Sequence, residues 1–123
     1  MNYQIKTIKS FEKAVRNLSK KFREIKKDIK EASCLLEENP FIGVPIPGYE
    51  GALWKLRVTN TSAKRGKQGG FRIVYLVNEV TEHCYLLIIY SKTDKTDVTY
   101  EEVENLLKAL EDEYFSDNSE NNG

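Results

Sequence analysis

Three short segments between residues 55 and 92 carry closely spaced basic side chains. The segments are KLR at 55–57, KRGKQGGFR at 64–72 and YSK at 90–92. Strand-like runs contain or border all three, so pairing of these strands would bring six or more cations onto one surface. Like charges in such a cluster repel one another, so a folded protein keeps them together most readily where an anion binds. The sequence therefore predicts a binding site for a polyanion such as a nucleic-acid backbone.

The distribution of charge along the chain supports this prediction. The 123 residues include 19 basic and 19 acidic side chains, so the formal net charge is zero. Residues 6–30 nevertheless hold ten Lys or Arg and three acids, and residues 55–75 hold six Lys or Arg and no acid. Residues 99–123 hold eight acids and a single Lys. A basic body with an acidic end is typical of proteins that bind polyanions.

Three strands must position the basic segments. Residues 53–59 alternate so that Lys55 and Arg57 share one face, opposite Trp54, Leu56 and Val58. Residues 71–77 and 84–90 form the next two strands, and the connection between them is too short for a parallel crossover, so we expect an antiparallel meander. A short first strand is predicted within residues 2–8.

The N-terminal third is predicted to be helical. From Phe11 to Leu36, apolar residues recur at alternating spacings of four and three. Ser10 can cap the start of this region, and the Asn-Pro pair at 39 and 40 ends it. The region is either one long helix or a helical hairpin that bends near residues 19–21, and a homodimeric coiled coil is the alternative.

The expected fold class is α+β. A small sheet, mainly antiparallel, packs against the N-terminal helix or helical hairpin and against a C-terminal helix, which begins with a capping box of Thr99 and Glu102. The length suits one domain, which we assign to residues 1–115. The polar tail at 116–123 is predicted to be disordered.

Composition also excludes several classes of protein. The longest apolar run, 85–90, is far shorter than the roughly 20 residues of a membrane helix, and the N-terminus lacks an apolar signal segment. We therefore expect a cytoplasmic protein without membrane contact. Cys34 and Cys84 have neither metal-ligand nor redox spacing and are expected to be free, buried thiols. No metal or other cofactor is predicted.

The basic segments resemble those of the RelE/ParE toxin superfamily, and within it the RelE- and HigB-like toxins of type II toxin–antitoxin systems. The resemblance extends from the helical N-terminal third through KLR, GGFRIVY and YLLIIYSK to DKTDVT before the last helix. It implies a RelE-like, microbial ribonuclease-type fold and metal-free cleavage of messenger RNA on the ribosome. The implied partners are a cognate antitoxin, the ribosome and messenger RNA, and the free protein would be a monomer or weak dimer.

The implied reaction is attack of a ribose 2′-hydroxyl on its own phosphate. It requires a base, stabilisation of the phosphorane and an acid for the leaving oxygen. The resemblance implies Arg57 and Arg72 as phosphate clamps, Lys55 or Lys67 as the base, and Lys92 or Lys95 as the donor to the anion or leaving group. The candidate catalytic residues are Lys55, Arg57, Lys67, Arg72 and Lys92. The candidate substrate-binding residues are Lys64, Arg65, Gly69, Gly70, Tyr90 and Lys95.

Two positions depart from the pattern of the superfamily. Thr93 and Thr99 stand where some relatives carry an arginine and a tyrosine, with Tyr100 adjacent. The acid role therefore stays open, and so do two alternative functions. One is a ParE-like toxin that inhibits gyrase, and the other is a non-catalytic relative that binds RNA or an antitoxin.

Overall fold

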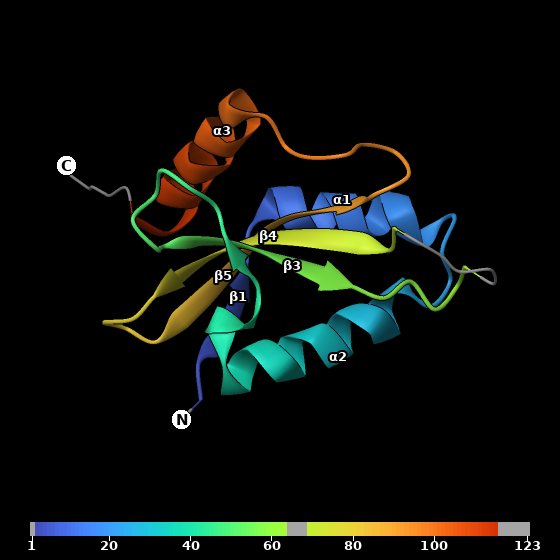
Figure 1. The fold of residues 1–123 in the computed structure, drawn as a ribbon, viewed down its shortest axis with the longest axis horizontal. Coiled ribbons are helices and arrows are strands. Elements are labelled where there is room, and N and C mark those ends of the chain that lie inside the picture. The colour runs from blue at the N-terminus through green and yellow to red at the C-terminus, as the bar shows by residue number, and fades with distance from the viewer. Residues whose placement is uncertain (1, 64–68, 116–123) are drawn as a thin grey trace.

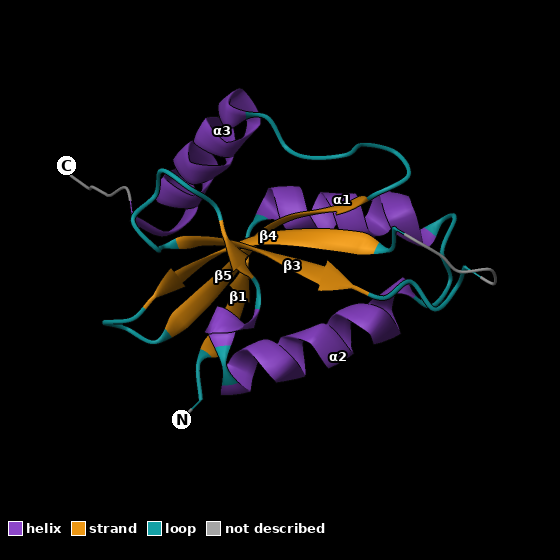
Figure 2. Ribbon diagram, in the orientation of Figure 1, coloured by secondary structure: helices purple, strands orange, loops and turns teal. Residues whose placement is uncertain are grey.

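The computed structural model describes residues 2–63 and 69–115, and these form an α+β fold (Figure 1 and Figure 2). The predicted fold class is confirmed, while the predicted tail at 116–123 lies outside the described residues. In chain order the elements are β1 (Gln4–Thr7), α1 (Lys9–Ser19), α2 (Ile25–Glu38), a 3-10 turn (Pro40–Ile42), β2 (Val44–Pro45), β3 (Leu53–Val58), β4 (Phe71–Asn78), β5 (His83–Ser91), α3 (Tyr100–Leu110) and a π-helical turn (Glu111–Phe115).

The five strands form one sheet in the order β1-β5-β4-β3-β2. The strand β1 is parallel to β5, and every other pair is antiparallel. The predicted meander of β3, β4 and β5 is therefore confirmed. Asn78 begins the turn between β4 and β5, where its side-chain oxygen accepts hydrogen bonds from the backbone N–H of Val80 (3.0 Å) and of Thr81 (3.2 Å). Such local bonds favour a tight turn over continued strand.

The N-terminal helical region is a hairpin of two helices, which is one of the two arrangements that the sequence left open. The helix α1 has 11 residues and α2 has 14, which is too short for the continuous heptad seam of the coiled-coil alternative. Phe22, in the turn between them, packs edge-on against Phe71 with ring centroids 5.3 Å apart, which fixes the tip of the hairpin on β4. The helix α2 ends just before Asn39, as predicted. No helix in the described part of the chain is long and apolar enough to span a bilayer.

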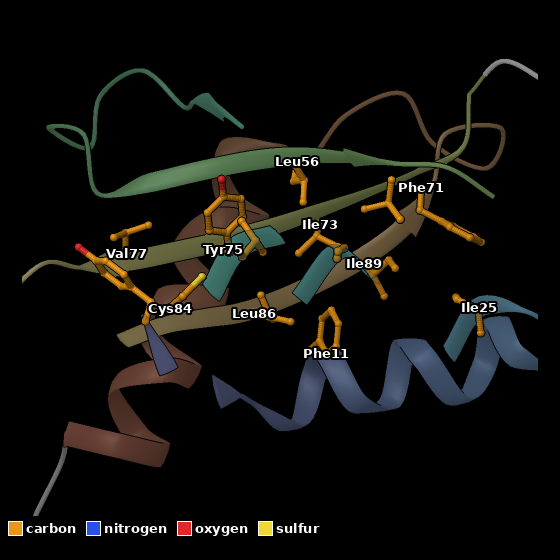
Figure 3. Close-up of a cluster of buried hydrophobic side chains, with 14 residues drawn as sticks. Phe11, Ile25, Leu56, Phe71, Ile73, Tyr75, Val77, Cys84, Leu86 and Ile89 are labelled. Carbon is orange, nitrogen blue, oxygen red and sulfur yellow. The ribbon is translucent and has the colours of Figure 1, made fainter. Parts of the chain in front are cut away.

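The helices cover opposite faces of the sheet. Phe11 of α1 and Ile25 of α2 belong to the same buried cluster as Ile73 and Leu86 of the sheet (Figure 3). On the other face, a second buried cluster joins α3 to the strands, and α2 and α3 lie on opposite sides of the sheet in Figure 1. The members of this second cluster include Leu53, Val74, Leu87, Tyr90, Val103 and Leu110.

A β-bulge in β5 decides which residues face α3. Val74 pairs with Ile88 but Tyr75 pairs with Leu86, so Leu87 is an extra residue in β5. An extra residue reverses the faces of all the residues that follow it. Tyr90 therefore lies on the α3 face, although simple alternation from Leu86 would place it on the other.

The bulge also explains why the predicted cap at Ser10 is wrong. The N-cap of α1 is Ile8, and Ser10 lies within the first turn of the helix. Its hydroxyl donates a hydrogen bond of 2.7 Å to the backbone carbonyl of Leu87. Because the extra residue of a bulge interrupts the strand ladder, this bond satisfies a carbonyl at the irregular point.

The two cysteines differ in exposure. Cys84 is buried in the core, as expected, and burial raises the pKa of its thiol to about 12. Cys34 is exposed on α2, so the prediction that it is buried is wrong. Ala32 and Leu36 are the residues of this part of α2 that face the sheet, and a residue midway between them in the helix points away from it.

Candidate functional site

Two arginines and a tyrosine form one row across the sheet. Arg57 of β3 lies directly opposite Arg72 of β4, and Arg72 lies directly opposite Tyr90 of β5. Directly opposed residues in antiparallel strands have Cβ atoms about 5 Å apart. We call these three residues the basic row. Like charges placed directly opposite each other destabilise a sheet, so the pairing of Arg57 with Arg72 requires an explanation beyond folding.

The guanidinium of Arg72 is held by backbone carbonyls. Its Nη1 donates to the carbonyl of Gly69 at 2.6 Å and to the carbonyl of Phe71 at 3.2 Å. Arg57 is exposed. Among residues 2–63 and 69–115, no carboxylate forms a salt bridge with either arginine. The positive charge of the basic row is therefore not neutralised by the described protein.

Lys55 lies beside the basic row and pairs with an acid that the sequence analysis did not include in the site. It shares a face with Arg57, two residues further along β3, and its Nζ donates to Oδ1 of Asp97 at 2.8 Å. The hydroxyl of Tyr90 donates to the same oxygen at 3.4 Å. The hydrogen bond from Lys55 is the main reason that the pKa of Asp97 is lowered, against the opposing effect of burial. Asp97 is therefore a carboxylate at neutral pH.

Tyr90 is a neutral hydrogen-bond donor in this arrangement. Burial raises its pKa to about 12, the charge of Asp97 adds to the effect, and the charge of Arg72 opposes it. A phenol with this pKa keeps its proton throughout the physiological range. Tyr90 can therefore donate a hydrogen bond or a proton to an anionic oxygen.

Lys95 lies over the ring of Tyr90 and contacts a second acid. Its Nζ is 5.6 Å from the centroid of the ring and donates to Oε2 of Glu102 at 2.5 Å. The other oxygen of Glu102 accepts from the backbone N–H of Thr99 at 2.7 Å, and the hydroxyl of Thr99 accepts from the N–H of Glu102 at 3.1 Å. The predicted capping box of α3 is therefore confirmed, and it also orients a partner of Lys95.

Lys92 is directed toward its own segment. Its Nζ donates to the carbonyl of Thr96 at 2.8 Å, and the hydroxyl of Thr93 contacts that of Ser91 at 2.9 Å. The structure thus brings Lys55, Arg57, Arg72, Tyr90 and Lys95 together, whereas the ammonium of Lys92 is bonded outside this group. The predicted site residues Lys64, Arg65 and Lys67 lie outside the described residues.

Gly69 and Gly70 have a structural reason to be glycine. Both have positive φ angles, of +108° and +64°. A Cβ atom on Gly70 would lie 2.5 Å from the carbonyl oxygen of Val58, and the Gly70 carbonyl accepts from the N–H of Lys92 at 2.9 Å. The backbone at Gly70 thus lies close to that of β3. It sets the position of Arg72 relative to Arg57.

Sequence reasoning missed the two carboxylates, Asp97 and Glu102, as members of the site. The signal that could have found them is the position of DKTD at 94–97 and of the capping glutamate directly after the last basic strand. The described residues contain no group of three or more His, Cys, Asp or Glu side chains that could hold a metal ion.

Comparison with known proteins gives a consistent result at the level of structure. No family model matches the sequence. The fold is similar to that of a free, double arginine-to-alanine mutant of the Escherichia coli toxin RelE, with a TM-score of 0.58 and 15% identity over 89% of this chain and 99% of that one. It is also similar to a chain of the Mycobacterium tuberculosis toxin–antitoxin complex RelBE2, with a TM-score of 0.55 and 14% identity over 74% of this chain and 99% of that one. The predicted structural similarity to RelE is therefore confirmed, and the chain has a RelE-like fold.

Proposed function

We propose that this protein is the toxin of a toxin–antitoxin pair and acts as a ribosome-dependent messenger RNA endonuclease. The observation that carries the proposal is the direct pairing of Arg57 with Arg72 on a face of the sheet where neither arginine forms a salt bridge with any described residue. A phosphate between the two guanidinium groups would remove their repulsion. The similarity of the fold to the toxin RelE supports the same conclusion.

The proposed reaction forms a bond between the ribose 2′-oxygen and phosphorus and breaks the bond from phosphorus to the 5′-oxygen. The products are a 2′,3′-cyclic phosphate and a 5′-hydroxyl. Arg57 and Arg72 bind the non-bridging oxygens and stabilise the extra negative charge of the phosphorane. In this scheme the arginines and lysines supply the positive charge that a metal ion supplies in other nucleases.

Proton transfer is assigned from the contacts of the individual side chains. Nζ of Lys55 donates a hydrogen bond to the carboxylate of Asp97, and we therefore propose Lys67 as the base. The proton of the leaving oxygen comes from Lys95 or from the phenol of Tyr90, which lie together beside Arg72. Thr99 caps α3 with its hydroxyl, so it does not take over the role of the tyrosine found near this place in some relatives.

The proposed partners follow from the same surface. Messenger RNA in the ribosome would lie across the basic row, and an antitoxin would inhibit the protein by covering that row. The similar RelBE2 chain was crystallised in a toxin–antitoxin complex. Action on ribosomes places the protein in the cytoplasm, and we propose that the free form is a monomer or weak dimer.

Induced expression in a bacterial host tests the function. We expect growth arrest, with cuts inside the codons of a reporter message mapped by primer extension. The matched control is the same reporter without a start codon, which we expect to remain uncut because the enzyme acts on translated messages. Arrest with intact messenger and relaxed plasmid DNA would contradict the proposal and favour a gyrase inhibitor. The absence of both arrest and cuts would favour a non-catalytic binding protein.

A further inference from the structure

One carboxylate oxygen beside the basic row accepts hydrogen bonds from three donors in the described part of the chain. Oδ1 of Asp97 accepts from Nζ of Lys55 at 2.8 Å, from the hydroxyl of Tyr90 at 3.4 Å and from the backbone N–H of Val98 at 2.8 Å. The first two donors belong to strands β3 and β5 of the sheet, and the third belongs to the segment that carries Asp97. The sheet thus presents a charged and a neutral donor to a single anionic oxygen.

Asp97 reaches this position from the segment that connects β5 with α3. In Figure 1 this segment runs back from the end of β5 toward α3 above the sheet. The Lys55 side chain is 27% exposed and that of Asp97 is 55% exposed, so solvent and ligands can reach the ion pair. An exposed ion pair contributes little to stability, so replacing Asp97 with another anion as the partner of Lys55 costs little free energy.

The surroundings of the ion pair belong to the proposed active site. Lys55 and Arg57 are two residues apart on β3, a separation of about 7 Å, which is close to one nucleotide step of an extended RNA strand. Tyr90 completes the basic row beside Arg72. A strand of RNA held by the two arginines would therefore bring a neighbouring phosphate to Lys55.

We propose that Nζ of Lys55 and the hydroxyl of Tyr90 form a second phosphate subsite, next to the one made by Arg57 and Arg72, and that the carboxylate of Asp97 fills it in the free protein. The inference rests on the proposed function, because it takes the RNA backbone as the ligand. A phosphodiester oxygen has the same charge and accepts the same hydrogen bonds as the carboxylate oxygen of Asp97. Binding of RNA then exchanges one anion for the other.

The exchange requires only a local movement of Asp97. Contacts on both sides hold its segment, since Nζ of Lys92 bonds the carbonyl of Thr96 and the capping box fixes Thr99 at the start of α3. Rotation of the Asp97 side chain away from Val98 would open the subsite without moving the backbone. Asp97 thus competes with the substrate for Lys55 and weakens the binding of RNA.

Binding of a non-cleavable RNA tests the proposal. The probe is a short, fluorescently labelled single-stranded RNA with 2′-O-methyl riboses, and its dissociation constant is measured by fluorescence anisotropy. We expect Asp97→Asn to bind about fivefold more tightly than the wild type, the factor that corresponds to a partly exposed ion pair. The matched control is Asp94→Asn, an exposed acid of the same segment that forms no salt bridge with any described residue. Its affinity should stay within about twofold of the wild type, because only screened, long-range charge is changed.

The same substitution made in a protein that lacks Lys55 distinguishes release of the subsite from a general effect of the lost negative charge. In a Lys55→Met protein, Asp97→Asn should no longer increase affinity, because the donor that it releases is absent. Equal gains for Asp97→Asn and Asp94→Asn, or a full gain in the Lys55→Met background, would overturn the proposal. If Asp97→Asn does not fold, Asp97→Ser removes the same charge and serves in its place.

The outcome is independent of the proposed catalytic activity. If the wild type cuts translated messenger but Asp97→Asn binds the probe no more tightly, the subsite is refuted and the nuclease function stands. If the expected gain is found in a protein that cuts no messenger, the subsite is supported and the nuclease function fails.

Discussion

Replacing Arg72 with alanine is expected to lower the rate of messenger RNA cleavage on the ribosome by at least about a hundredfold. Arg72 occupies the centre of the basic row, between Arg57 and Tyr90, and two backbone carbonyls fix its Nη1. A guanidinium held in this way stabilises developing charge without having to be reoriented during the reaction. The rate is measured under single-turnover conditions on ribosomes stalled on a defined codon.

Two further variants make the result specific. Arg72→Lys keeps the charge but loses the planar pair of donors, so its rate should fall between those of the wild type and Arg72→Ala. Arg16→Ala removes an equal charge from an exposed position on α1 and should retain most of the activity. If Arg72→Ala cleaved the messenger at the wild-type rate, or if Arg16→Ala lost as much activity as Arg72→Ala, the basic row would not be the active site.

Gly70→Ala is expected to produce the largest loss of stability among the site substitutions, about 3 kcal/mol in the free energy of unfolding. Gly70 has a φ angle of +64°, and an added Cβ would lie 2.5 Å from the carbonyl oxygen of Val58. Neither atom belongs to the end of a flexible side chain, so β3 and β4 would have to separate. Chemical unfolding in urea, followed by circular dichroism, measures the change.

Gly51→Ala is the matched control for this substitution. Gly51 also has a positive φ angle, of +79°, but no atom of the described residues lies within 4 Å of the position of its Cβ. It should therefore lose only the backbone contribution, about 1 kcal/mol. Equal losses for the two variants would mean that the contact with Val58 does not matter. Val58 directly follows Arg57 in β3. The close approach of Gly70 to Val58 therefore also links the stability of these paired strand ends to the position of Arg57 in the basic row.

Much of the fold could be predicted from local patterns. Alternation in residues 53–59 placed Lys55 and Arg57 on one face, and the short connection at 78–83 required a hairpin. The choice between one helix and two stayed open, because the contact of Phe22 in the turn with Phe71 of β4 is a tertiary one that no local pattern encodes. No local pattern in the sequence indicates the bulge at Leu87, although the bulge places Tyr90 on the same face of the sheet as Arg72. The backbone carbonyl of Leu87 accepts a hydrogen bond from Ser10, which lies 77 residues earlier in the chain.

The candidate site was harder to predict than the fold because one of its acids, Asp97, belongs to irregular structure. The path of the segment from Lys92 to Thr99 decides that Asp97 meets Lys55, and no periodic pattern encodes that path. The capping box of Thr99 and Glu102 was predictable, whereas the bond from Lys95 to the same glutamate was not. Cationic residues on strands could thus be found from spacing, but their partners required the structure.

The most direct test of the proposed reaction is a single-atom change in the messenger. Purified protein is added to ribosomes stalled on a defined codon, and the cleaved ends are analysed for a 2′,3′-cyclic phosphate. The message is then prepared with one 2′-deoxyribose at the nucleotide that provides the attacking hydroxyl. We predict that the all-ribose message is cut with a cyclic phosphate end and that the substituted message is left intact at that position. Cleavage of the substituted message at the same bond would contradict the account, because no 2′-oxygen would be present to attack the phosphate.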